Sequence, residues 1–168
     1  CSVLLMSCYN NPDNPIEGKL DQTEVMNIFS CEEEFKQGMI ALAVCAILSP
    51  DVDLVTFELM NNHAHMIMRG SKSGGLDLFC RFRLRLKRLC RRWGRGLDWS
   101  GFEPQVLEIE SLKALRNEIV YVNRNAYVAN YQYTPFSYPW GGGWAYFSPM
   151  IMQLPKKAAR ELGVKKVR

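Results

Sequence analysis

Residues 76–95 form the longest stretch with a single clear periodicity, and this stretch limits how the rest of the chain can fold. Its apolar side chains recur every three or four residues, which is the spacing of one face of an α-helix. They are Phe79, Phe82, Leu86, Leu89, Cys90 and Trp93. The RFRLRL part also alternates like a strand, but the helical match is longer. We therefore expect a helix with one buried face.

The segments around this helix predict an α+β fold. Alternating or short apolar runs indicate strands at residues 2–9, 52–59, 65–69 and 104–110. Helical spacing indicates two more helices, at 30–48 with Ser30 as N-cap and at 112–129 with Ser111 as N-cap. The order β, α, β, β, α, β, α is typical of a small, largely antiparallel sheet with helices packed on it.

The length of 168 residues suits one domain. We expect a domain at residues 1–135, with a small-residue loop at 70–75, and an aromatic and basic tail at 136–168. The aromatic side chains between 127 and 147 can stack on unpaired bases or pack on the domain, and packing is the expectation for most of them.

Charge is distributed unevenly along the chain. Residues 1–70 hold 3 Lys and Arg against 10 Asp and Glu, whereas residues 71–168 hold 18 against 7. Eight of these cations lie between residues 81 and 95 with no acid among them. A solvated helix face usually mixes signs, so this face predicts a polyanionic partner, with nucleic acid ahead of a membrane surface. The cations expected to contact phosphates are Arg81, Arg85, Lys87, Arg88 and Arg92.

Cysteine spacing and hydropathy indicate a cytosolic protein. No apolar run approaches the length of about 20 residues that a membrane span needs. The six cysteines show no CxxC spacing. We expect buried, reduced thiols at Cys31, Cys45, Cys80 and Cys90, because these four lie in apolar periodic segments.

The only two histidines, His63 and His65, are separated by one residue in an apolar segment. Alternate side chains of a strand share a face, so both imidazoles would point the same way. Two readings stay open at this point: a rigidly held metal or catalytic pair, and chance polar insertions near a strand edge.

The helix at 112–129 offers further partners in Asn117, Tyr121 and Asn125, which are four residues apart and share one face. Two imidazole nitrogens and an Asn oxygen can hold a divalent cation with positions left for water and a phosphate oxygen. Such a mixed set suits Mg²⁺ or Mn²⁺ better than a structural zinc, which takes four protein ligands. A tyrosine oxygen could then attack the polarised phosphorus.

Two motifs carry a resemblance to a known family. In MNNHAHMIMRG, His63, Ala64 and His65 match a His-hydrophobic-His signature, and in IVYVNRNAYVA, Tyr121 and Asn125 match a Tyr-x-x-x-Asn/Gln pattern. With the two motifs in this order, residues 1–140 resemble the single-tyrosine HUH transposases, and more narrowly the REP-associated tyrosine transposases.

The resemblance implies a ferredoxin-like sandwich with the histidine pair on a central strand and the tyrosine on a neighbouring helix. It implies nicking and rejoining of single-stranded or hairpin DNA, with Tyr121 as the nucleophile that forms a 5′-phosphotyrosine. His63, His65 and Asn125 would bind Mg²⁺ or Mn²⁺, and no nucleotide cofactor is needed. The expected location is the cytoplasm, at the nucleoid; whether two copies form a homodimer stays open.

This chain departs from the family pattern at one point, because many relatives have Asn-Pro where it has Asn125-Ala126. Tyr127 and Tyr131 are rival nucleophiles. Two other functions are weighed against the transposase: a catalytically silent HUH protein that binds hairpin DNA, and a different metal-binding or RNA-processing domain in which Tyr121 belongs to the core.

Overall fold

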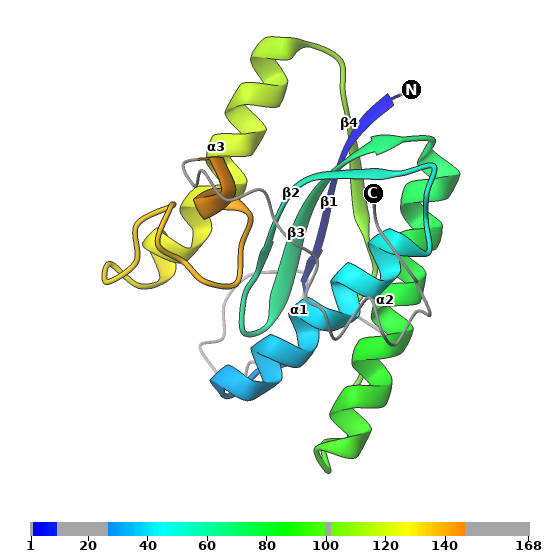
Figure 1. The fold of residues 1–168 in the computed structure, drawn as a ribbon, viewed down its shortest axis with the longest axis vertical. Helices are drawn as coiled ribbons and strands as arrows, with labels where there is room; N and C mark the ends of the chain where they lie inside the picture. The colour runs from blue at the N-terminus through cyan, green and yellow to red at the C-terminus, as the bar shows by residue number, and fades with distance from the viewer. Residues whose placement is uncertain (1, 10–26, 100–101, 147–168) are drawn as a thin grey trace, which may run out of the picture.

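The fold is a four-stranded sheet with three helices, seen in the computed structural model of Figure 1. The structure describes residues 2–9, 27–99 and 102–146. None of the helices within these ranges is both long and apolar enough to cross a membrane. In chain order the elements are β1 (Ser2–Tyr9), α1 (Glu32–Ile47), β2 (Asp53–Leu59), β3 (His63–Gly70), α2 (Lys72–Arg92), β4 (Gln105–Ile109), α3 (Leu112–Ala129) and the short 3-10 helix η1 (Gly143–Tyr146).

The sheet has the strand order β2-β3-β1-β4, and every neighbouring pair is antiparallel. The order βαββαβ with β3 inserted between β1 and β2 is that of the ferredoxin-like sandwich. This confirms the predicted α+β class. Figure 1 shows α1 and α2 together on one side of the sheet and α3 on the other.

Strand alternation divides the core into two layers. Met6, Phe57 and Met66 belong to the large cluster that includes Leu42 of α1 and Phe82 of α2. The residues between them point the other way, so that Leu5 and Ile67 pack with Val122 of α3. The face of β3 that carries its histidines is therefore the face that α3 covers.

Helix α2 begins at Lys72, four residues earlier than its apolar stripe predicted, so the expected loop at 70–75 is wrong. Ser71 is the N-cap, and its side chain accepts a hydrogen bond from the amide of Gly74 at 3.0 Å. A Cβ on Gly75 would lie 3.2 Å from Leu4 of β1. The glycines therefore allow close packing of the helix on the sheet, and do not mark a loop.

The cysteines follow the prediction only in part. Cys31, Cys45, Cys80 and Cys90 are free thiols, as expected, but only Cys45 and Cys90 are buried. Burial of Cys31 and Cys80 was predicted wrongly. Cys31 is the N-cap of α1, where the side chain meets solvent, and Cys80 lies on the exposed side of α2.

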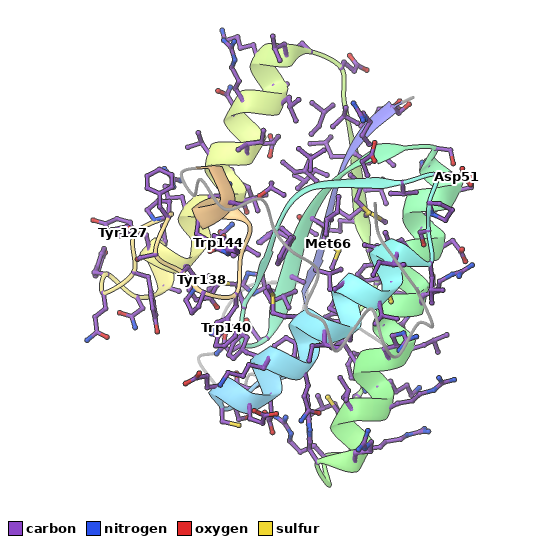
Figure 2. All side chains as sticks on the ribbon, viewed as in Figure 1. Asp51, Met66, Tyr127, Tyr138, Trp140 and Trp144 are labelled. Carbon is purple, nitrogen blue, oxygen red and sulfur yellow. The ribbon has the colours of Figure 1, made fainter. Side chains whose placement is uncertain are left out.

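The segment after α3 packs against the end of β2. Tyr138 is buried and donates its hydroxyl to the carbonyl of Leu59 at 2.7 Å. Trp140 stacks on Phe35 of α1 with ring centroids 5.2 Å apart. Figure 2 shows Tyr138 and Trp140 between α3 and α1, whereas Tyr127 lies on the outer side of α3. Residues 147–168 of the expected aromatic and basic tail lie outside the described residues.

Candidate active site

A row of four polar side chains crosses the sheet beneath α3. The strand register aligns Glu58 of β2 with His65 of β3, His65 with Ser7 of β1, and Ser7 with Gln105 of β4. Residues directly opposite one another in an antiparallel ladder point to the same face. His63 joins this face because it precedes His65 by two residues.

Each histidine is oriented by a neighbouring polar side chain. His63 Nδ1 lies 2.7 Å from Asn62 Oδ1, and His65 Nδ1 lies 3.0 Å from Ser7 Oγ. An amide oxygen only accepts, so His63 Nδ1 donates and its Nε2 keeps a lone pair. The Ser7 hydroxyl can accept from the same tautomer in His65. Hydrogen bonds of this kind orient the histidine ligands of metal sites.

Burial lowers the pKa of His63 to about 4. Burial also lowers the pKa of His65 to about 4, with a smaller contribution from the neighbouring His63. Both imidazoles are therefore neutral at neutral pH. Because only a neutral imidazole binds a metal, no proton has to be displaced from either ring.

Tyr121 of α3 lies against this pair. The rings of His65 and Tyr121 meet edge to face with centroids 5.5 Å apart, and those of His63 and His65 are 4.9 Å apart. Tyr121 is 39% exposed, so its position is accessible from solvent. This exposure does not fit the reading in which Tyr121 belongs to the core.

An open groove of about 330 Å³ begins at Tyr121 and runs along β1 and β4. Ser7, the partner of His65, lies in its lining together with Leu5, Gln105, Val106 and Leu107. A substrate strand in this groove would lie beside both the phenol and the histidine pair.

Asn125 lies one helical turn after Tyr121 and is partly buried. Its Nδ2 donates to the carbonyls of Tyr121 at 3.0 Å and Val122 at 3.1 Å. With the amide nitrogen held on the helix, Oδ1 is the atom that remains for another partner. Asn117, the third member of the predicted stripe, is exposed.

The donor atoms of His63, His65 and Asn125 are of the kinds that a divalent cation with open coordination positions takes. Two neutral imidazoles and one amide oxygen form a mixed nitrogen and oxygen set, which leaves room for water and a phosphate oxygen. Across the ranges that the structure describes, no three His, Cys, Asp or Glu side chains gather where they could hold a metal. The site therefore lacks the closed ligand set of a structural zinc.

Sequence reasoning missed Glu58 and Ser7. Glu58 is 1% exposed, and burial raises its pKa to about 7, opposed by the hydrogen bond that its Oε1 accepts from the amide of Ala126 at 2.9 Å. The available signal was a polar residue at alternate positions of an apolar strand, Thr56 and then Glu58. No signal in the sequence indicates Ser7, because only the register of β1 against β3 places it opposite His65.

The predicted phosphate-binding cations lie in the other layer of the molecule. Arg85, Arg88 and Arg92 line a groove of about 450 Å³ between α1 and α2, which also contains Glu33. Lys87 lies on another side of α2, beside Arg83 and Leu84. The structure does not bring these cations to the histidines.

The expectation of an acid-free helix face is wrong for three arginines. Ion pairs join Arg81 to Asp77 at 2.7 Å, Arg83 to Glu103 at 2.6 Å and Arg95 to Glu34 at 2.6 Å. Two of these acids come from segments distant in the sequence, so counting charges within residues 81–95 could not reveal them.

These elements define the class of fold: a ferredoxin-like sandwich whose free sheet face is covered by an added helix. The arrangement is similar to the solved structure of a REP-associated tyrosine transposase bound to a REP hairpin, with a TM-score of 0.57. The likeness covers 84% of this chain and 75% of that chain at 10% sequence identity, so it concerns the fold. No protein-family model and no curated protein sequence matches the chain.

Proposed function

We propose that the chain is a transposase-like enzyme that cuts and rejoins single-stranded DNA beside a hairpin, with Tyr121 as nucleophile. The observation that carries this proposal is the edge-to-face contact of Tyr121 with His65, 5.5 Å between centroids. The fold shared with a tyrosine transposase supports it. Hairpin DNA is accordingly the proposed partner.

In the proposed reaction, Tyr121 Oη attacks the scissile phosphorus and the bond from phosphorus to the 3′ oxygen breaks. The products are a 5′-phosphotyrosine and a free 3′-hydroxyl. The phenol gives its proton to solvent, and the leaving 3′ oxygen takes a proton from solvent. The phosphotyrosine conserves the energy of the bond, so a 3′-hydroxyl can reverse the step and rejoin a strand without a nucleotide cofactor.

Mg²⁺ or Mn²⁺, bound by His63, His65 and Asn125 Oδ1, would polarise the scissile phosphate as a Lewis acid. Asn62 and Ser7 hold the two imidazoles in orientation. The groove along β1 and β4 receives the strand and directs its backbone past Tyr121.

The test is covalent capture of DNA. Labelled hairpin oligonucleotides with randomised stems and single-stranded flanks are incubated with protein and Mn²⁺, and adducts are separated on a denaturing gel. We expect an adduct with the natural chain and none with Tyr121→Phe, because phenylalanine has no oxygen to attack phosphorus.

Tyr127→Phe and Tyr131→Phe are the matched controls, and both should keep the adduct. An adduct that persists in Tyr121→Phe would contradict the assignment of the nucleophile. Tight hairpin binding without any Mg²⁺- or Mn²⁺-dependent cleavage would instead favour the catalytically silent DNA-binding protein.

A further inference from the structure

Glu58 is the only acidic side chain in the buried class among residues 2–9, 27–99 and 102–146. It lies in the polar row beneath α3, directly beside His65 in the strand ladder. The proposed reaction does not use it.

The segment after α3 closes the outer edge of β2 over this carboxyl group. Gly141 forms a bridge with Glu58, and the amide of Gly142 donates to the carbonyl of Phe57 at 2.8 Å. On the same edge, the amide of Leu59 donates to the carbonyl of Trp140 at 2.9 Å. Several backbone hydrogen bonds therefore hold residues 140–142 against β2, where they help to bury Glu58.

Glu58 holds α3 beside the candidate ligand Asn125. In a regular α-helix the amide of Ala126 is directed to the carbonyl of Val122. Here the Ala126 amide donates to Glu58 Oε1 at 2.9 Å, and the Val122 carbonyl accepts Asn125 Nδ2 at 3.1 Å. The carboxyl group thus contacts the helix at the residue that follows Asn125.

Stability does not account for this contact. In a regular helix the Ala126 amide would donate to the Val122 carbonyl without any contribution from Glu58, whereas a buried carboxyl group is costly to desolvate. Glu58 Oε2 has no hydrogen-bond partner within the described part of the chain. An apolar side chain of the same length would fill the space without that cost.

We propose that Glu58 is a positioning residue of the metal site: through the Ala126 amide it sets where α3 lies over β3, and so brings Asn125 Oδ1 to the His63 and His65 pair. The inference rests on the proposed function, because it takes Asn125 as a ligand. Glu58 does not itself join the two histidines as a third ligand, since the described residues contain no such group of three.

The test compares metal affinity with stability. Glu58→Met keeps the length of the side chain but removes the acceptor, and Glu58→Gln keeps an acceptor oxygen. We expect Glu58→Met to weaken Mn²⁺ binding at pH 7.5 by about 10- to 100-fold, as loss of a supporting contact in a metal site does. Its metal-free thermal midpoint should equal or exceed that of the natural chain, and Glu58→Gln should recover most of the affinity.

Thr56→Val is the matched control, because Thr56 lies two residues away on the same face and its hydroxyl contacts Asn123 of α3 at 3.5 Å. It should leave Mn²⁺ affinity unchanged. Full affinity in Glu58→Met, or loss of affinity only in step with loss of metal-free stability, overturns the positioning role. If the natural chain binds no Mn²⁺ at all, the proposed metal site fails first, and the positioning role fails with it.

Discussion

Three ionisable side chains on one face of the sheet have pKa values moved in opposite directions; His65 and Glu58 are buried, and His63 is partly buried. The two histidines have a pKa of about 4 in the folded protein, below the ordinary 6.5. Glu58 has a pKa of about 7, above the ordinary 4.5. From pH 4.5 to 6.5 the unfolded chain therefore binds up to two more protons at the histidines, and one fewer at Glu58.

These signs predict that metal-free stability rises between pH 4.5 and 6.5. Stability increases with pH where the unfolded state binds more protons, and the two histidines outweigh Glu58 by one group. Each shift corresponds to about 3 kcal/mol, so the net rise is on the order of 3 kcal/mol. Urea unfolding across this range, with a chelator present, measures it.

The double variant His63→Gln/His65→Gln should reverse the sign of this dependence. Only Glu58 then titrates among the three, and its raised pKa makes stability fall as pH rises from 4.5 to 7. The chain contains no other histidine, so the change can be assigned to this pair. A variant whose stability still rises with pH would show that burial of the imidazoles is not the cause.

At the residue scale, the sequence indicated those candidate site residues that stand out by type or spacing. His63 and His65 were proposed because histidine occurs only twice, and Tyr121 and Asn125 because they recur at helical spacing. Ser7 and Glu58 were missed because their roles depend on which residues face each other across strands. Serine and glutamate are common, and strand register cannot be read from either strand alone.

Among the elements, helix α1 lacks a side-chain hydrogen bond from its N-cap residue. The N-cap is Cys31 and not the predicted Ser30, and its side chain makes no capping hydrogen bond. Glu34 makes one hydrogen bond at this end of the helix, since its Oε2 accepts from the Ser30 amide at 2.7 Å. The cap position has φ −149° and ψ 165°, the extended geometry that serine adopts there.

Cys31→Ser should therefore stabilise the protein by about 1 kcal/mol, because a hydroxyl can accept one of the first helical amides. Urea unfolding is the measurement. Cys80→Ser is the control, since Cys80 is also an exposed free thiol but lies within α2, where no cap is needed. Equal shifts in the two variants would rule out capping as the cause.

Helix α2 separates its cations into two groups. Arg81, Arg83 and Arg95 are held in ion pairs, whereas no ion pair joins Arg88 or Arg92 to another residue within the ranges 2–9, 27–99 and 102–146. The groove that Arg88 and Arg92 line has no aromatic side chain in its lining, so it offers no ring on which unpaired bases could stack. Its other lining residues are Glu33, Gln37, Ile40, Ala41, Val44, Arg85 and Leu89. This surface suits the backbone of a base-paired stem better than a single strand.

Arg88→Gln/Arg92→Gln should weaken binding to a blunt DNA hairpin stem and lower the slope of log affinity against log salt by about 2. Fluorescence anisotropy at several salt concentrations measures both quantities. Lys87→Gln/Arg91→Gln removes the same charge from positions about 100° around the helix and should change the slope little. Equal losses in the two variants would mean that net charge, and not the groove, binds the stem.

For the whole molecule, periodicity predicted the order of the elements but not the side of the sheet on which each chemical group lies. The sequence showed both the apolar stripe of α2 and the alternate histidines of β3. Neither pattern predicts that α2 and the histidines lie on opposite sides of the sheet. Layer assignment follows from the β3 insertion between β1 and β2. From the sequence, this order of β1, β3 and β2 is expected only through the resemblance to a known family.

The two layers have a physical consequence for any bound hairpin. A stem held between α1 and α2 would lie across the sheet from Tyr121, so a flank that Tyr121 is proposed to cut must pass around an edge of the sheet. Because β4 is the edge strand next to the groove at Tyr121, a path around this edge would set the strand length between the stem and the proposed cut site.

The histidine pair and the tyrosine meet within one polypeptide, and this has a consequence for mixtures of damaged copies. A Tyr121→Phe chain keeps the proposed metal ligands, and a His65→Ala chain keeps the phenol, yet neither contains all the groups that the proposed reaction needs. Mixing the two inactive proteins should therefore produce no adduct on a denaturing gel. Recovery of adduct in the mixture would show that two copies exchange α3. The tyrosine of one chain would then act with the histidines of the other.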